Sequence, residues 1–329
     1  MKKKFLIRVD YNDKVGLGHV YRSINLGQLL IKYKHEITIL INKEKKINLV
    51  KNKKINFIFL KKNITLIEET NLILKMFKNK KYDYLILDID NFYCKKTKYE
   101  KYLSKLKNIM NKTICWDNII SNKFNFALTY RPYPDYLNLK KLKKKQKILS
   151  GLQYLYYPYK KITNKNGRKS ILINMGATIK NKTLKDIISV INSMKLNHKL
   201  NIKIVNAKLK KNLMKIRHHN FTILKRTLRP NVLYNKIDLA IVSGGMSKFE
   251  CMLNSIPCIV INLNKDQSRI NKRLNYKKLC LVVDNISLLN KKLKILITNK
   301  KLRREIKNNC YKISKKFEEK KLVNKLTNL

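Results

Sequence analysis

One pattern recurs along this sequence: a short apolar run typical of a strand is followed by a stretch with the apolar spacing of a helix. Strands and helices that alternate in this way form right-handed βαβ units and a parallel sheet. The pattern predicts strands at residues 5–9, 36–41, 54–60, 84–87, 113–116, 124–128, 171–174, 200–205, 221–224, 239–242 and 257–261. Helices are expected at residues 18–33, 64–77, 99–106 and 183–194, from about residue 247, and over most of residues 287–317.

The alternation breaks between about residues 130 and 168, where three of the five prolines fall and a polar segment follows. Such a break is typical of a domain boundary. We therefore expect an α/β protein with two Rossmann-like parallel-sheet domains, residues 1–160 and 161–329, and a last helix that could cross back to the first domain. In folds of this kind ligands bind at the carboxyl ends of the strands, so the two domains would face a central cleft.

The net charge of +56 has an unusual make-up, since 65 of the 76 basic residues are lysine. The lysines are spread over the whole chain, and Lys, Asn and Ile are the residues of A/T-rich codons. Nucleic-acid-binding proteins usually show an arginine-rich patch or a recognisable module instead. Nucleic-acid binding is therefore the weakest hypothesis for the function of this chain. The positive charge suits an anionic small ligand equally well.

The six cysteines form no C-x-x-C pair, and most lie in apolar surroundings, as free thiols of a reduced compartment do. The apolar stretch near the N-terminus is too short for a secretory signal. No apolar run approaches the ~20 residues that a membrane span needs. We therefore expect a cytoplasmic protein with no membrane span.

A glycine-rich turn, Gly16-Leu17-Gly18-His19, joins the first predicted strand to the first predicted helix. Glycine lets the backbone turn tightly and approach a ligand closely. The N-terminus of a helix carries about half a positive charge, which disfavours a protonated imidazole there. A neutral His19 can accept a proton at neutral pH, so it is the first candidate for a general base. The alternative, a histidine that caps a surface turn, stays open.

A second turn, Gly244-Gly245, follows an apolar strand and opens a helix. Free backbone N–H groups and the helix dipole converge at such a point, which suits a diphosphate. Ser247 adds a hydroxyl, and Glu250 projects from the same helix face and could accept from a ribose diol. The alternative is a capping box formed by Ser247 and Glu250, which needs no ligand.

Asp88-Ile89-Asp90 follows a predicted strand, and alternation places both carboxylates on one face. A D-x-D triplet could hold a divalent cation that binds a nucleotide diphosphate. The same triplet is frequent where strands run into loops, so we expect no metal. The sequence has no P-loop and no nucleophile elbow, and the remaining histidines lack the spacing of zinc ligands.

With these residues in view, the chain resembles the nucleotide-sugar hydrolases of pseudaminic-acid biosynthesis and their relatives in spore-coat polysaccharide synthesis. That family has the glycosyltransferase-B architecture, with a C-terminal domain similar to MurG. Its first pattern, R-x-D followed by G-x-G-H-x-x-R and a leucine-rich helix, is present at Arg8, Asp10, Gly16, Gly18, His19, Arg22 and Leu26. Its second pattern is present at residues 238–241, Gly244, Gly245, Glu250, residues 255–257 and Gln267.

The resemblance implies an inverting hydrolysis, without metal or cofactor, of a UDP-linked 2,4-diacetamido-2,4,6-trideoxyhexose, with release of UDP, in nonulosonic-acid or surface-polysaccharide biosynthesis. It makes His19 the general base. The substrate-binding residues that it implies are Asp10, Gly16, Gly18, Arg22 and Gln267. The nucleotide-binding residues are Gly244, Gly245, Met246, Ser247 and Glu250, with Leu224 added from its position at a strand end. The alternative is a nucleotide-sugar-dependent glycosyltransferase of the same fold, acting in surface-polysaccharide synthesis with the same base.

The sequence departs from the family pattern where the family shapes its sugar pocket. Asp266 replaces an asparagine before Gln267, Asn118 replaces the second aspartate after Trp116, and the arginine usual after Tyr154 is missing. Gly176-Ala177-Thr178 stands where the family has Gly-Gly-x-Asp. The motifs therefore define the nucleotide better than they define the sugar.

Overall fold

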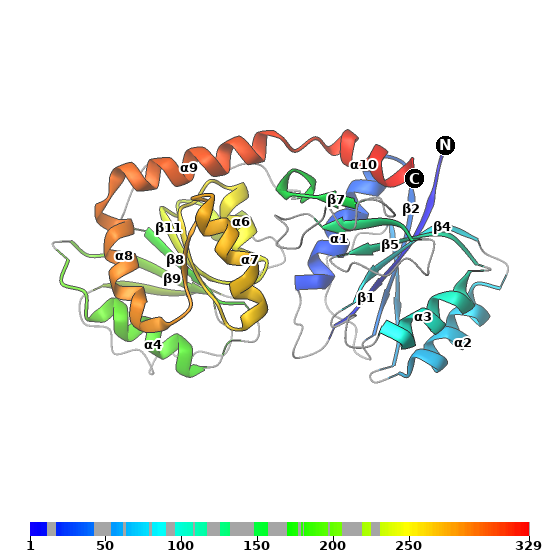
Figure 1. The fold of residues 1–329 in the computed structure, drawn as a ribbon. Helices are drawn as coiled ribbons and strands as arrows, with labels where there is room; N and C mark the ends of the chain where they lie inside the picture. The colour runs from blue at the N-terminus through cyan, green and yellow to red at the C-terminus, as the bar shows by residue number, and fades with distance from the viewer. Residues whose placement is uncertain are drawn as a thin grey trace. The chain divides into compact units, whose positions relative to one another are not determined.

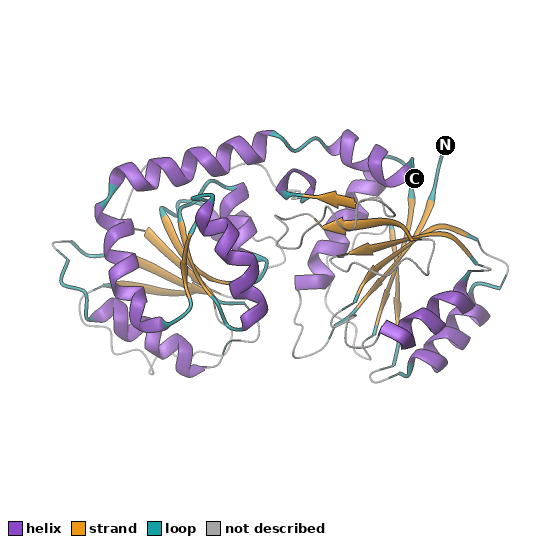
Figure 2. Ribbon diagram, in the orientation of Figure 1, coloured by secondary structure: helices purple, strands orange, loops and turns teal. Residues whose placement is uncertain are grey.

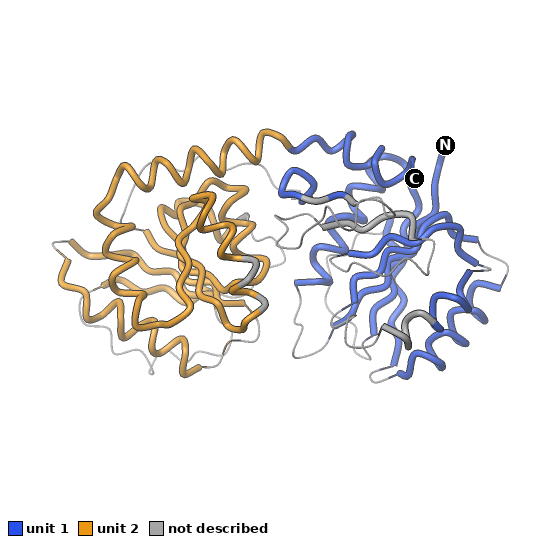
Figure 3. Tube along the Cα trace, in the orientation of Figure 1, with its two compact units in different colours: residues 1–158, 317–329 blue, residues 159–316 orange. Residues whose placement is uncertain are grey.

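The computed structural model describes residues 1–11, 18–42, 54–61, 64–78, 81–89, 96–107, 109–116, 126–131, 148–156, 170–176, 179, 181–196, 198–205, 219–224 and 231–328. The chain forms two compact units (Figure 3). Unit 1 comprises Met1–Pro158 together with Phe317–Leu329, and unit 2 is Tyr159–Lys316. The boundary between them lies two residues before the one expected from the sequence.

Within the described residues, unit 1 contains a seven-stranded sheet in the order β3-β2-β1-β4-β5-β6-β7, and every pair of neighbours is parallel (Figure 1). Its strands are β1 (Lys4–Val9), β2 (Glu36–Ile41), β3 (Ile55–Phe59), β4 (Tyr82–Asp88), β5 (Met110–Trp116), β6 (Phe126–Arg131) and β7 (Ile148–Ser150). The strand order reverses between β1 and β4. In open parallel sheets this switch point is where ligands bind.

Helices cover both faces of this sheet: α1 (Gly18–Lys32), α2 (Leu66–Met76), α3 (Lys96–Leu106) and α10 (Glu319–Thr327). Alternation along β1 explains the two cores, because Phe5, Ile7 and Val9 pack with α1 and α10, whereas Leu6 packs with α2 and α3. The side-by-side pair of α2 and α3 is visible in Figure 1. Both faces are apolar, as expected for a parallel sheet.

Unit 2 contains a six-stranded sheet within the described residues, in the order β10-β9-β8-β11-β12-β13, again entirely parallel (Figure 2). Its strands are β8 (Ser170–Asn174), β9 (Asn201–Val205), β10 (Asn220–Leu224), β11 (Leu239–Ser243), β12 (Cys258–Ile261) and β13 (Leu281–Val283). Its helices are α4 (Asn181–Asn192), α5 (Asn231–Tyr234), α6 (Ser247–Leu253), α7 (Lys265–Tyr276), α8 (Leu289–Thr298) and α9 (Lys300–Lys315). The switch point lies between β8 and β11. Among the described residues there are also two short 3₁₀ helices, η3 (Leu152–Tyr154) in unit 1 and η5 (Ile286–Leu288) in unit 2.

The last helix belongs to unit 1, although the chain reaches it only after the whole of unit 2. Leu322, Val323 and Leu326 of α10 are buried in the same core as α1 and β1. Tyr84 Oη donates to the carbonyl of Thr327 at 2.6 Å, and Lys32 of α1 pairs with Glu319. The core of unit 1 is therefore completed by the C-terminal segment.

The expected fold class, two parallel-sheet α/β domains, is confirmed. Each strand that the apolar runs predicted is present, with shifts of a few residues at the ends. The pattern missed β7, β13, α5 and α7, and its last predicted helical range ended at residue 317, before α10. In the part of the chain that the structure describes, no helix has the length and apolar content needed to cross a bilayer.

Candidate active site

The carboxyl end of β4 places a buried carboxylate against the first turns of α1. Asp88 is the last residue of β4 and is 0 % exposed. His19 Nδ1 lies 2.7 Å from its Oδ1, Arg22 Nε donates to Oδ2 at 2.8 Å, and Ser23 Oγ donates to Oδ2 at 3.1 Å. Arg22 Nη2 also donates to Oδ1, so the guanidinium binds both oxygens.

The local sequence explains why these groups meet. Residues 19, 22 and 23 are three and four apart, so they share one face of α1. Along β4, Tyr84 and Ile86 pack in the core that contains α1, while Leu85 and Leu87 pack in the opposite one. Asp88 follows in the same alternation and therefore faces α1.

The hydrogen bonds around Asp88 determine which nitrogen of His19 carries a proton. An ionised carboxylate only accepts, so Nδ1 of His19 must donate to Asp88. Arg22 Nη2 lies 3.1 Å from the same Nδ1, but a protonated ring nitrogen has no lone pair, so this is a close contact rather than a second hydrogen bond. In the neutral ring the free lone pair is then on Nε2, an assignment that rests on the network. The His19 side chain is 24 % exposed, which leaves it open to a ligand.

Asp88 stays ionised because of its neighbours. Burial alone would raise its pKa, but the charges of Arg22 and His19 outweigh burial and hold the pKa well below the usual range of an aspartate. Arg22 is itself almost buried, and its guanidinium lies over the Trp116 ring, 4.9 Å from the centroid. Asp88 can therefore hold one ring orientation of His19 and stabilise a positive charge on it.

The R-x-D motif forms a second buried network beside the first. Arg8 Nε and Nη2 donate to the two oxygens of Glu69 on α2 at 2.6 and 2.9 Å, and Nη1 donates to Asp10 Oδ1 at 2.7 Å. Tyr102 Oη also donates to Glu69. Burial alone would lower the pKa of Arg8, but the charges of Glu69 and Asp10 outweigh burial and hold this pKa above its usual value. Arg8 therefore fixes the position of Asp10, whose N–H donates to the carbonyl of Asp88 at the switch point.

The D-x-D hypothesis does not agree with the surroundings of Asp88. Both of its oxygens accept hydrogen bonds from α1, and one of its partners is the cationic guanidinium of Arg22. Among the described residues, no group of three or more His, Cys, Asp or Glu side chains is arranged to hold a metal ion. Asp90 lies outside the described residues, as do Gly16 and the Asp117-Asn118 pair.

In unit 2 the Gly244-Gly245 turn lies directly after β11, at the second switch point. Gly244 N–H donates to the carbonyl of Ile261 at 3.0 Å, and the buried Lys248 Nζ donates to the carbonyl of Gly244. Because the peptide is trans, the N–H of Gly245 points away from that lysine. A Cβ on Gly244 would lie 2.5 Å from Gln267 Oε1 and 2.8 Å from Asn271 Nδ2, so a larger residue here requires these two side chains to shift.

The capping-box alternative for this turn is wrong. α6 begins at Ser247 with Met246 as its N-cap, and no side chain caps it. The first N–H groups of a helix have no acceptor within the helix, so those of this turn can bind a ligand. Instead of capping, Glu250 accepts a hydrogen bond from Tyr234 Oη at 2.6 Å on its Oε2. Burial raises the pKa of Glu250 to about 6, although the Tyr234 hydroxyl acts in the opposite direction.

Gln267 lies beside Gly244, as the position of its amide shows. Its Oε1 accepts from the N–H of Leu263 at 2.9 Å, which leaves the Nε2 side of the amide for a ligand. Leu224 is the last residue of the edge strand β10 and lies three strands from β11, on the order of 14 Å at the usual strand spacing. The structure thus brings Gly244, Gly245, Met246, Ser247, Glu250 and Gln267 together and places Leu224 apart from them.

The sequence did not reveal the roles of two residues of the candidate site, Asp88 and Tyr234. Asp88 was considered only as a metal ligand, yet its partner is His19; the alternation along residues 84–88 was the signal that could have placed it against the first helix. Tyr234 follows no motif, and nothing in the sequence connects it to Glu250.

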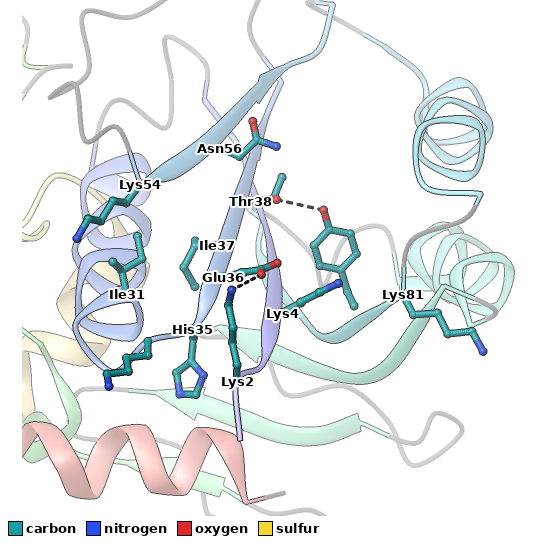
Figure 4. Close-up of a pocket in the computed structure, with 12 residues that line it drawn as sticks. Lys2, Lys4, Ile31, His35, Glu36, Ile37, Thr38, Lys54, Asn56 and Lys81 are labelled. Atoms are coloured by element: carbon teal, nitrogen blue, oxygen red, sulfur yellow. Dashed lines mark hydrogen bonds and ion pairs between the residues drawn. The ribbon is translucent and has the colours of Figure 1, made fainter.

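A cavity of about 650 Å³ lies at the opposite, amino-terminal edge of the unit 1 sheet (Figure 4). It is lined at the starts of β1 to β4, with Lys2 paired to Glu36 and Tyr82 Oη donating to Thr38 at 3.1 Å. Five of its twelve lining residues are lysine. Because lysine makes up about a fifth of this chain, its abundance here does not mark a ligand site.

Comparison with solved structures tests the fold. The glycotransferase of kitacinnamycin matches with a TM-score of 0.70 at 10 % identity over 99 % of both chains. MurG of Acinetobacter baumannii matches with a TM-score of 0.67 at 13 % identity over 100 % of both chains. The spinosyn rhamnosyltransferase SpnG in complex with thymidine diphosphate matches with a TM-score of 0.66 at 12 % identity, over 99 % of this chain and 100 % of that one.

The chain has the glycosyltransferase-B fold. The sequence comparisons add one relative, the uncharacterised protein MJ1062 of Methanocaldococcus jannaschii, 27 % identical over 284 residues. The match covers 80 % of this chain and 56 % of that protein, so the chain spans about half the length of the relative. No protein-family model matches the sequence. In this fold, candidate site residues follow strand ends at the switch point of each sheet.

Proposed function

We propose that the protein is an enzyme that uses a UDP-sugar and passes the sugar to an oxygen nucleophile, with release of UDP. The observation that carries this proposal is the His19–Asp88 pair at the switch point of unit 1, with Nδ1 committed to the carboxylate. The fold supports it, because the glycosyltransferases that share the fold include one solved with thymidine diphosphate.

In the proposed reaction the acceptor O–H gives its proton to Nε2 of His19. The acceptor oxygen forms a bond to the anomeric carbon, and the bond from that carbon to the diphosphate oxygen breaks, with its electron pair leaving on UDP. Asp88 stabilises the imidazolium that forms. The N–H groups at residues 245–247 hold the diphosphate, where negative charge increases as the bond breaks.

A glycan or lipid-linked hydroxyl is the acceptor that the fold favours, which makes the protein a glycosyltransferase of surface-polysaccharide synthesis. A second candidate acceptor is water, with a UDP-linked 2,4-diacetamido-2,4,6-trideoxyhexose as the substrate. The observation that favours water is the R-x-D and G-x-G-H-x-x-R pair of motifs, whose six defined residues resemble those of the hydrolase family. Both reactions use His19 in the same role and take place where nucleotide sugars occur, in the cytoplasm.

The test is UDP release from UDP-sugars, with and without candidate acceptors and with EDTA present. The proposal expects turnover that EDTA does not reduce. Release that depends on an acceptor supports transfer, and release in buffer alone supports hydrolysis. His19→Asn is expected to lower turnover by about 10²–10⁴-fold while UDP still binds. An active His19→Asn variant would contradict the assignment of the base.

A further inference from the structure

The Tyr234 side chain is fully buried, at 0 % exposed, yet its hydroxyl binds two polar partners from different elements. It donates to Glu250 Oε2 at 2.6 Å, and Asn174 Nδ2 lies 3.4 Å from the same oxygen. A phenolic hydroxyl has one hydrogen, and a carboxylate only accepts, so that hydrogen is committed to Glu250. Asn174 therefore donates to Tyr234, and the chain of hydrogen bonds runs from β8 through α5 to α6.

Glu250 is only partly satisfied by this contact. Within the described part of the chain, Tyr234 Oη is the only group that binds its carboxylate, and no cation pairs with it. Its second oxygen, Oε1, has no hydrogen-bond partner among the same residues. Glu250 is only partly buried, and Oε1 is not enclosed by the surrounding residues, so this oxygen is accessible to a ligand that can donate a hydrogen bond to it. Glu250 lies three residues after Ser247 on α6, beside the Gly244-Gly245 turn.

We infer that Tyr234 is a positioning residue: its hydroxyl fixes the Glu250 carboxylate so that Oε1 accepts from the ribose hydroxyls of a nucleoside diphosphate, and this sets a preference for ribonucleotides. The inference rests on the proposed function, because it takes the Gly244-Gly245 turn as the diphosphate site. A flexible carboxylate would lose conformational entropy on binding the diol, and Tyr234 removes that cost beforehand. Asn174 supports the arrangement by fixing the hydroxyl.

The experiment measures the affinities of the full-length protein for UDP and for 2′,3′-dideoxy-UDP by calorimetry. We expect the wild type to bind UDP roughly 10- to 100-fold more tightly, the range for a hydrogen bond to a charged group. Tyr234→Phe keeps the ring and should reduce that ratio several-fold by weakening UDP alone. Tyr276→Phe is the matched control, since Tyr276 of the same unit is 87 % exposed, and it should change neither affinity.

Each outcome decides the inference. A ratio that Tyr234→Phe leaves unchanged, or an equal loss for both ligands, would overturn it, because a purely structural tyrosine does not distinguish the two. If Tyr234→Phe does not fold, Glu250→Gln must show the same selective loss, and an intact ratio there also overturns the inference. A wild type that binds UDP without preference for the ribose overturns the inference alone. A wild type that does not bind UDP contradicts the proposed function itself.

Discussion

Asp88→Asn replaces the carboxylate that orients His19 with a neutral amide of the same size. In the wild type, Nδ1 and Oδ1 are 2.7 Å apart, which puts the charge centres of an imidazolium and this carboxylate about 4 Å apart. At an effective dielectric constant of about 20, that interaction is about 4 kcal/mol. Since each 1.36 kcal/mol is tenfold in rate, we expect kcat to fall about 10³-fold.

The same substitution leaves the guanidinium of Arg22 buried without its carboxylate, so the free energy of unfolding should fall by about 3–5 kcal/mol. Steady-state kinetics therefore have to be measured below the unfolding transition, which a urea titration locates. His19→Asn is the control, because it removes the base and keeps the Asp88–Arg22 pair. If Asp88 acts through His19, adding Asp88→Asn to His19→Asn should lower kcat no further. A folded Asp88→Asn variant with wild-type kcat would refute the reasoning.

Three further predictions concern other parts of the chain. Gly244→Ala puts a Cβ 2.5 Å from Gln267 Oε1, so it should weaken UDP binding and lower the free energy of unfolding, measured by urea titration, by about 1–3 kcal/mol. The control is Gly245→Ala, whose Cβ would lie 3.6 Å from its nearest neighbour and which should keep wild-type stability. The folded-state pKa of Glu250, about 6, exceeds the unfolded value of about 4.3, so the native state retains a proton that the unfolded chain releases. Stability relative to Glu250→Gln should therefore fall by on the order of 2 kcal/mol as the pH rises from 4.3 to 6, and urea titrations at both ends of that window would show it; a constant difference would contradict it. Deleting residues 317–329 removes three buried apolar side chains of α10 and should cost about 5 kcal/mol, seen as a lower Tm; an unchanged Tm would contradict the packing.

Most of the fold was predictable because parallel strands are buried on both faces. The segments that became β1, β2, β4 and β11 are nearly continuous apolar runs, and polar residues after them mark their ends, with glycine-bearing turns after β1 and β11. α7 was missed because its residues are mostly charged or polar, and among the side chains of that helix that the structure describes only Leu274 and Asn271 are fully buried. β7 is three residues long at a sheet edge, too short for a period to appear.

The candidate site was predictable where it depends on local backbone and not where it depends on tertiary partners. His19 and the Gly244-Gly245 turn follow from strand–turn–helix spacing, which the sequence displays directly. The partner of His19 is 69 residues away, and the partner of Glu250 belongs to a helix of four residues that has no motif. Alternation places a carboxylate on a face of the sheet, but only the packed structure shows that a histidine and an arginine occupy that face.

The return of α10 to unit 1 has a consequence for biosynthesis. On the ribosome, residues 1–158 emerge with a groove over α1 and β1 still open to water, and the segment that fills it is translated only after the 158 residues of unit 2. At about 5–20 residues per second, that interval lasts on the order of ten seconds or more. During this time the nascent N-terminal half exposes apolar surface that a chaperone can bind, and unit 2 can finish folding first.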